Sequence, residues 1–301
     1  MDLLLKLILN GVVAGCVYFL FTVGFTLTYG IFKVVNLAQG AILVAGGFAG
    51  LWCDAILDAP LVVSLVVAAI ASGLLAVLMD ASVLRLLERK SVVGSHGGEF
   101  GPLVVTLAFG TVVLGLFGNL VGHDSYSFDH AGWFTAPAFG YVSRVDVFLL
   151  GITVVFGYFL YHVISRTSTG AKVRAVAEDR SMAAAVGVRP AVVSAGTYFA
   201  TGAVTGVTGV LIGVKFSSMN VGIWEGYLVL GFVIATVGGL GSILGTAVAA
   251  FAVGLISQLL GHYQSQAAVT ITIYLLLFIT LFIRPSGLFG RGSAALGVAR
   301  T

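Results

Sequence analysis

Long apolar segments recur along nearly the whole chain and constrain its fold more than any other feature. Hydrophobic residues make up 59% of the 301 residues and charged residues only 9%, too few charges to cover a water-soluble domain of this size. A helix needs about 20 mostly apolar residues to cross a bilayer. Segments that meet or approach this length cover residues 7–30, 36–53, 61–84, 102–121, 146–164, 192–215, 227–241, 242–260 and 267–283.

These segments predict an all-α integral membrane protein, a polytopic bundle of about eight or nine transmembrane helices within a single domain of residues 1–301. Residues 227–241 are short for a crossing, so they and residues 242–260 form either two crossings or a broken pair. Nine crossings place the N-terminus outside and the C-terminus inside. Eight crossings require one re-entrant segment.

Basic residues mark the loops that we expect on the cytoplasmic side. They are Lys33, Arg85, Arg89, Lys90, Arg166, Lys172, Arg174, Arg180, Arg189, Arg284, Arg291 and Arg300. The remaining loops are acidic and should face outward, with Asp54, Asp58, Asp124, Asp129 and Glu225. The net charge of +3 therefore describes topology and predicts no nucleic-acid partner.

The chain holds 41 glycines, many of them four residues apart within the apolar segments. Small residues at this spacing let helix backbones approach closely in a membrane. Pairs of this kind are Gly11/Gly15, Gly46/Gly50, Gly202/Gly206, Gly209/Gly213 and Gly241/Gly245. They predict tight packing within one bundle, with contacts between subunits or a substrate path as the alternatives.

The apolar segments lack the residues that ion coupling or catalysis requires. Asp80, His162 and Lys215 lie near predicted segment ends, where their side chains can reach the interface or form pairs. The five histidines and two cysteines show no metal-ligand spacing, and no phosphate-binding loop is present. We therefore expect no enzyme, no cofactor on this chain, and an energy source on another subunit if transport is active.

The loop of residues 165–191 is long, polar and predicted to be cytoplasmic. Residues 171–178 favour a helix, and residues 183–186 suggest a second short helix that Asp179 or Ser181 could cap. Gly187 fits a helix stop and Pro190 fits a boundary. Such a loop is either a helix that docks in a groove of a soluble partner or a helix at the membrane surface.

Four motifs of this chain resemble those of the branched-chain amino acid ABC transporter permeases, in the expected order. The loop contains Ala177-Glu178-Asp179 followed by residues 182–188, and the N-terminal part leads from Asn10-Gly11 to Val35-Asn36-Leu37-Ala38-Gln39-Gly40. Residues 237–245 resemble the Gly-Gly-x-Gly-Ser segment of that family, and residues 284–290 resemble its ending. The chain is most similar to the first of the two permease subunits in such systems.

The resemblance implies a multi-pass permease in a bacterial inner membrane, with ATP used only by partner subunits. Those partners are a second permease subunit, two cytoplasmic ATPase subunits and a periplasmic amino-acid-binding protein. It assigns the ATPase-coupling role to Gly170, Ala177, Glu178, Asp179, Ala183 and Gly187. It places the translocation path at Asn36, Gln39 and Gly40 and at a helix break formed by Gly238, Gly239, Gly241 and Ser242.

Substrate identity stays open at this point. Many relatives carry an acidic residue where this chain has Ala41, and related systems import urea, short amides or other hydrophobic amino acids. The alternatives are therefore a urea or amide permease, a self-sufficient channel or carrier, and an integral membrane enzyme, for which the segments lack a polar cluster.

Overall fold

The computed structural model describes residues 2–84, 100–122, 124–128, 134, 136–139 and 142–290. The helices are α1 (Asp2–Phe32), α2 (Gln39–Leu57), α3 (Leu61–Met79), α5 (Phe100–Val121), α7 (Arg144–Arg166), α8 (Ser168–Glu178), α9 (Arg180–Ala185), α10 (Pro190–Phe216), α11 (Ile223–Gly238), α12 (Ile243–Tyr263) and α13 (Gln266–Ile283). A π-helical turn, η1 (Asp80–Leu84), extends α3, and strands β1 (Pro137–Phe139) and β2 (Val142–Ser143) form a small hairpin.

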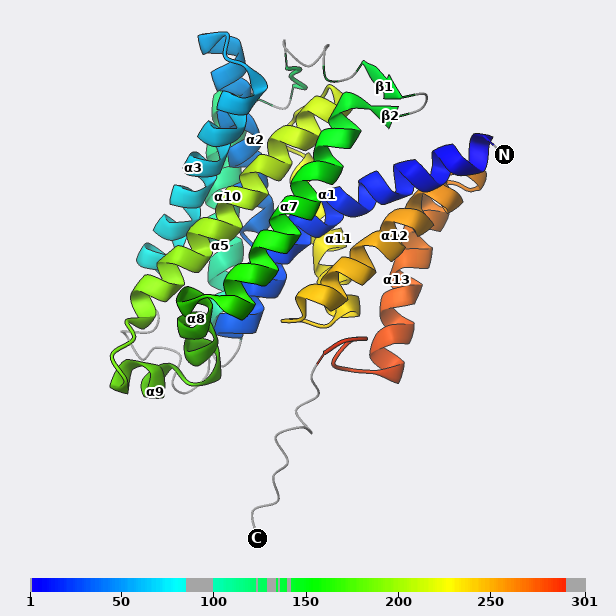
Figure 1. The fold of residues 1–301 in the computed structure, drawn as a ribbon. Helices are drawn as coiled ribbons and strands as arrows, with labels where there is room; N and C mark the ends of the chain where they lie inside the picture. Colours follow the sequence, from blue (N-terminus) through cyan, green and yellow to red (C-terminus); the bar gives the residue numbers. More distant parts are fainter. Residues whose placement is uncertain are drawn as a thin grey trace.

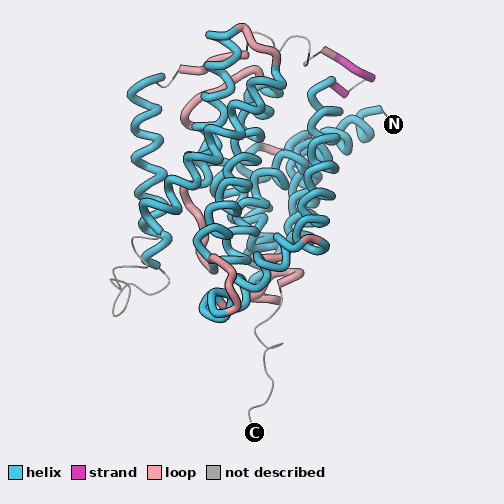
Figure 2. Tube along the Cα trace, turned by 60° about the vertical axis from the view of Figure 1, so that its left-hand side comes forward, coloured by secondary structure: helices cyan, strands magenta, loops and turns pink. Residues whose placement is uncertain are grey.

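Among the described residues, eight helices are long and apolar enough to cross a membrane, and α11 is a shorter apolar helix of 16 residues. These nine helices correspond one to one with the nine predicted apolar segments. The polytopic all-α prediction is therefore confirmed, with the β1–β2 hairpin as an addition that the sequence did not suggest. Figure 2 shows that helices make up almost all of the described chain.

The long helices form one bundle with two distinct ends. Helices α8 and α9 and the end of α13 lie at one end, which we call the loop end, and the β1–β2 hairpin lies at the opposite end (Figure 1). Helix α10 packs along α2 and α3, and α1 packs along α12. The spans of α5, α7 and α13 are mostly unburied and line the outside of the bundle.

Glycine lets the central helices touch at their backbones. A Cβ at Gly46 of α2 or at Gly254 of α12 would collide with backbone atoms of Gly206 or of Gly11 and Gly15, respectively. These contacts support packing within one bundle, the first of the alternatives that the glycine spacing left open.

Two acidic residues differ from their predicted places. Asp54 lies in the last turns of α2 and is only 3% exposed, and Glu225 lies in the first turn of α11. Both were expected in outward loops, and the error arose because each helix extends beyond the apolar run that predicted it. Arg85, Arg89, Lys90, Asp129, Arg291 and Arg300 lie outside the described residues.

Candidate functional site

The chain turns back into the bundle before α2 begins. Residues 33–38 connect α1 to α2 without a regular helix, starting at Lys33 with a positive φ of 56°. Helix α2 was predicted from residue 36 and begins at Gln39, because the intervening backbone makes other bonds. The Asn36 side-chain oxygen accepts a bond of 3.0 Å from the Ala38 N–H, and the Leu37 N–H donates to the Thr106 hydroxyl at 3.2 Å.

Gln39 joins this segment to α10. Its side-chain nitrogen donates to the Thr205 hydroxyl, and its oxygen accepts from the Asn36 amide at 3.4 Å. Asn36, Gln39 and Thr205 are fully buried, and Thr205 lies near the middle of the 27-residue α10. We call Asn36, Gln39, Thr106 and Thr205 the amide cluster. It is a set of satisfied polar groups deep in the bundle, where an unsatisfied group would cost several kcal/mol.

Neighbouring helices close tightly around the amide cluster. The Gln39 side chain occupies the space that a Cβ on Gly24 of α1 would need. A Cβ on Gly40 would lie 3.2 Å from Trp224 Cβ of α11. Helices α1, α2, α10 and α11 therefore meet at Gln39 and Gly40, two of the residues predicted to lie near the path.

The predicted helix break between α11 and α12 is present. Gly239 and Gly241 have φ of 99° and 92°, which side-chain-bearing residues rarely adopt. Ser242 caps α12 by accepting a bond from the Gly245 N–H at 3.2 Å. The N–H groups of Leu288 and Phe289 donate to the carbonyls of Val237 and Gly238 at 2.9 and 3.1 Å. Backbone from residues 286–290 thus satisfies the end of α11.

The predicted path residues form two groups that do not merge. Gln39 contacts α1 at Gly24, whereas Gly241 contacts α1 at Gly30, its Cα 3.2 Å from the position of a Gly30 Cβ. Six residues of helix separate these contacts by about 9 Å. Gly238 and Gly239 are buried against protein backbone, so among the described residues the two groups are linked through the helices around them.

The predicted coupling loop consists of two short helices, α8 and α9, between α7 and α10. Asp179 is the N-cap of α9 and accepts bonds from the N–H groups of Ser181 and Met182 at 2.8 and 2.9 Å. The Ser181 hydroxyl donates to the same oxygen at 2.6 Å. The Ser181 hydroxyl first, and then the two backbone donors, hold the pKa of Asp179 below its usual range. The predicted cap is confirmed, and one oxygen of the Asp179 carboxylate accepts three hydrogen bonds from within the loop.

Glycines close both ends of this loop. Gly187 has a φ of 87°, and the N–H groups of Gly187 and Val188 donate to the carbonyls of Ala184 and Ala183, each at 3.0 Å. This is the Schellman ending of a helix. A Cβ at Gly170 would overlap the carbonyls of Val163 and Ile164, so glycine permits the sharp turn between α7 and α8.

The exposure of the loop side chains separates its inner face from its outer face. Ala183 is 3% exposed and packs with Ile31 of α1 and Val176 of α8, so it attaches the loop to the bundle. Glu178 is exposed, and Met182 and Val186 are 68% and 78% exposed. We call Glu178, Met182 and Val186 the outer face. Met182 and Val186 were not predicted as contact residues, although two large apolar side chains in a polar loop were the available signal.

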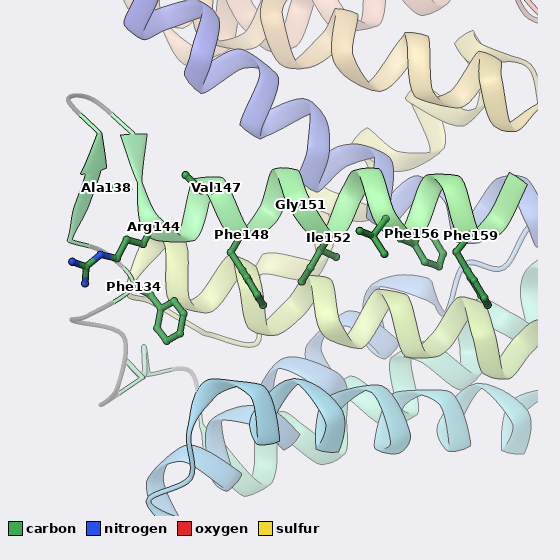
Figure 3. Close-up of a pocket in the computed structure, with 10 residues that line it drawn as sticks. Phe134, Ala138, Arg144, Val147, Phe148, Gly151, Ile152, Phe156 and Phe159 are labelled. Carbon is green, nitrogen blue, oxygen red and sulfur yellow. The ribbon is translucent and has the colours of Figure 1, made fainter. Parts of the chain in front are cut away.

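A cavity of about 680 Å³ lies along α7, away from the predicted path. Phe148, Ile152 and Phe159 extend from the same side of α7, and Arg144 lies at the end near Phe134 (Figure 3). None of its ten lining residues belongs to the amide cluster or to the α11–α12 break. Within the described part of the chain, no group of His, Cys, Asp and Glu is arranged to hold a metal ion.

Lys215 was predicted to snorkel or to pair near a membrane interface. The structure pairs its ammonium group with the Asp146 carboxylate, which is also bonded to Ser143 at the start of α7. This ion pair joins α7 and α10 at the end opposite the loop end.

Comparisons with known proteins cover most of the chain. Residues 7–283 match the family described as "Branched-chain amino acid transport system / permease component". BraD of Pseudomonas aeruginosa, a high-affinity branched-chain amino acid transport system permease protein, is 25% identical over 95% of this chain and 96% of its own length. LivH of Escherichia coli K12, of the same description, is 26% identical over the same shares. PsaBC from Streptococcus pneumoniae, solved in complex with Fab, gives a TM-score of 0.47 at 14% identity over 95% of this chain and 92% of that chain.

Proposed function

The chain belongs to the branched-chain amino acid transport permease family, and from this premise we propose that it imports branched-chain or related hydrophobic amino acids. As a permease component it is a multi-pass membrane protein and not an enzyme, and partner ATPases hydrolyse the ATP. The proposal adds a second permease subunit, two ATPase subunits on the cytoplasmic side, and a periplasmic binding protein that delivers the amino acid. The family match over residues 7–283 carries this proposal.

The outer face of the loop is the proposed contact with an ATPase subunit. Two exposed apolar side chains on the capped helix α9, and an exposed carboxylate at the end of α8, suit a groove on a soluble protein. Ala183, Gly170 and Gly187 have a different role in this proposal. Ala183 packs the loop against Ile31 of α1, Gly170 permits the close turn against α7, and Gly187 ends α9. A push on Met182 or Val186 then acts directly on the end of α1 through Ile31.

The amide cluster is the proposed part of the path in this subunit. Its bonds join α2 to α10 through side chains, and side-chain hydrogen bonds can exchange partners without unfolding either helix. A passing amino acid, which carries both charges, would substitute its own polar groups for those bonds. The alternative substrates, urea and short amides, would meet the same groups, so substrate choice is decided by experiment.

Co-purification with the ATPase subunits tests the coupling proposal. In Ala177→Pro the ring removes a helix hydrogen bond and clashes within the last turn of α8, and Glu178→Arg reverses the charge of the outer face. We expect both variants to lose assembly or the ATPase stimulation by loaded binding protein. Glu178→Gln, which keeps the size of the side chain, is the matched control and should retain most of both. Normal assembly and stimulation in both test variants would refute the coupling role of residues 171–187.

A substrate panel then tests the finer proposal. The wild-type complex is mixed with binding protein loaded with leucine, isoleucine, valine, acetamide or urea, and its ATPase rate is measured. Stimulation by the three amino acids supports the proposal. Stimulation by urea or acetamide alone assigns the chain to the alternative substrate class.

A further inference from the structure

Helix α10 is the element that leaves the coupling loop, and it carries polar contacts at several levels of the bundle. Helix α9 ends at Ala185 and α10 begins at Pro190, so only residues 186–189 separate them. A displacement of α9 therefore reaches the first turns of α10. Ser194 lies in these turns and is 2% exposed.

Ser194 contacts the end of α3. Its hydroxyl donates to the Asp80 carboxylate at 2.6 Å, and Asp80 is also 2% exposed. Asp80 begins the π-helical turn η1, where α3 stops following the α-helical pattern. Such turns are rare and are frequent at functional sites. A carboxylate that is buried among helices needs hydrogen bonds, so it holds the contacts it makes firmly.

The contact belongs to a row along one face of α10. Tyr198, one turn after Ser194, stacks on the Phe32 ring with centroids 5.4 Å apart. It also packs in one buried cluster with Met79 of α3 and Ala38, which precedes α2. Thr205, further along, accepts the bond from Gln39. A shift of α10 would therefore displace its contacts on α3, on the end of α1 and on the start of α2.

We propose that the Ser194–Asp80 hydrogen bond is a second transmission contact, through which α10 moves the end of α3 when the ATPases close. The first contact is that of Ala183 with Ile31, which acts on the end of α1. Asp80 is thus a positioning residue that acts through Ser194. This inference rests on the proposed function, because it requires an ATPase-driven loop.

The test measures amino acid uptake and ATP hydrolysis in the same proteoliposomes, with the full complex and loaded binding protein. Ser194→Ala and Asp80→Ala should each lower the ratio of uptake to hydrolysis about tenfold, the loss that about 1.4 kcal/mol of coupling gives. Ser194→Thr keeps the hydroxyl, and Asp80→Asn keeps an acceptor oxygen, so both should restore most of the ratio. The double variant Ser194→Ala/Asp80→Ala should lose no more than either single variant.

Ser72→Ala is the matched control, because Ser72 is a fully buried serine of α3 whose hydroxyl donates to a carbonyl of its own helix. It should leave the ratio unchanged. An unchanged ratio in Ser194→Ala, or equal loss in Ser194→Ala and Ser72→Ala, would overturn the inference. If Asp80→Ala fails to assemble, Ser194→Ala against Ser194→Thr still decides. Absence of ATP-dependent uptake in the wild type would instead refute the proposed function itself.

Discussion

Two breaks in the helical bundle differ in the groups that satisfy most of their backbone. In residues 33–38, between α1 and α2, the side chains of Thr106 and Asn36 accept bonds from the N–H groups of Leu37 and Ala38, and Gln39 joins Asn36 to Thr205 through side-chain bonds. Residues 239–242, between α11 and α12, use two glycines with positive φ and the backbone N–H groups of Leu288 and Phe289. Both lie against α1, at Gly24 and Gly30.

This difference indicates that the α1–α2 break can rearrange its hydrogen bonds more easily than the α11–α12 break can. Side-chain hydrogen bonds break one at a time by rotation about side-chain torsions, and a ligand can replace them. Backbone bonds between closely packed segments, such as those from Leu288 and Phe289 to the end of α11, change only when the whole segments move apart. We infer that the α1–α2 break serves the path and that the α11–α12 break is a rigid joint.

Gly238→Ala should have the largest effect on stability, because its new Cβ would collide with backbone atoms in the rigid joint. The new Cβ would lie 2.6 Å from the carbonyl carbon and oxygen of Gly245, and neither atom can turn aside. We expect a loss of about 3 kcal/mol of stability, at the upper end for overpacking, seen as a lower melting temperature and a poor yield of monodisperse protein. Gly226→Ala, in the same helix with open space around it, should behave as wild type.

Gln39→Ala should reduce function more than stability. It removes the bonds to Thr205 and Asn36, at a cost of about 2 kcal/mol for the buried groups left behind. We expect assembly to survive while uptake in proteoliposomes falls at least about tenfold, a loss worth about 1.4 kcal/mol. Thr26→Val removes another buried hydroxyl bond, to Thr246, and should keep uptake. Equal uptake in both variants would remove the distinction between the two breaks.

Ser242→Ala tests the α11–α12 break through its side-chain cap. It deletes the cap of α12 and should cost about 1 kcal/mol of stability. Uptake per assembled complex should stay at the wild-type level, since the joint is held mainly by backbone. A large drop in uptake without a change in melting temperature would place the α11–α12 break in the path.

Asp179→Asn should give the smallest effect, and it serves as a reference outside both breaks. Because the pKa of Asp179 is lowered in the folded loop, its capping contribution is complete above the ordinary carboxyl pKa and is lost as pH falls through the lowered value. Asparagine also caps helices, so ATPase binding near neutral pH should match wild type. In acid, where the wild-type cap protonates, the variant should bind better than wild type in a pH series.

The sequence predicted local features well and contacts between distant residues poorly. All nine apolar segments are helices, because hydropathy requires only neighbouring residues, and the Asp179 cap and Gly187 ending follow from local spacing. The Gln39–Thr205 bond joins residues far apart in the chain, so only the fold reveals it. The same holds for Ala183, which was predicted as a coupling residue and lies buried against Ile31.

Leucine uptake by proteoliposomes is the most direct test of the central claim. The claim is that this chain forms part of a transport path that partner ATPases drive through the loop of α8 and α9. The preparations are the full complex with binding protein, with and without ATP, and this chain alone. We predict uptake only with the full complex, binding protein and ATP together, and its loss in Ala177→Pro. Leucine entry through the chain alone, unaffected by ATP, would contradict the account and identify a self-sufficient channel or carrier.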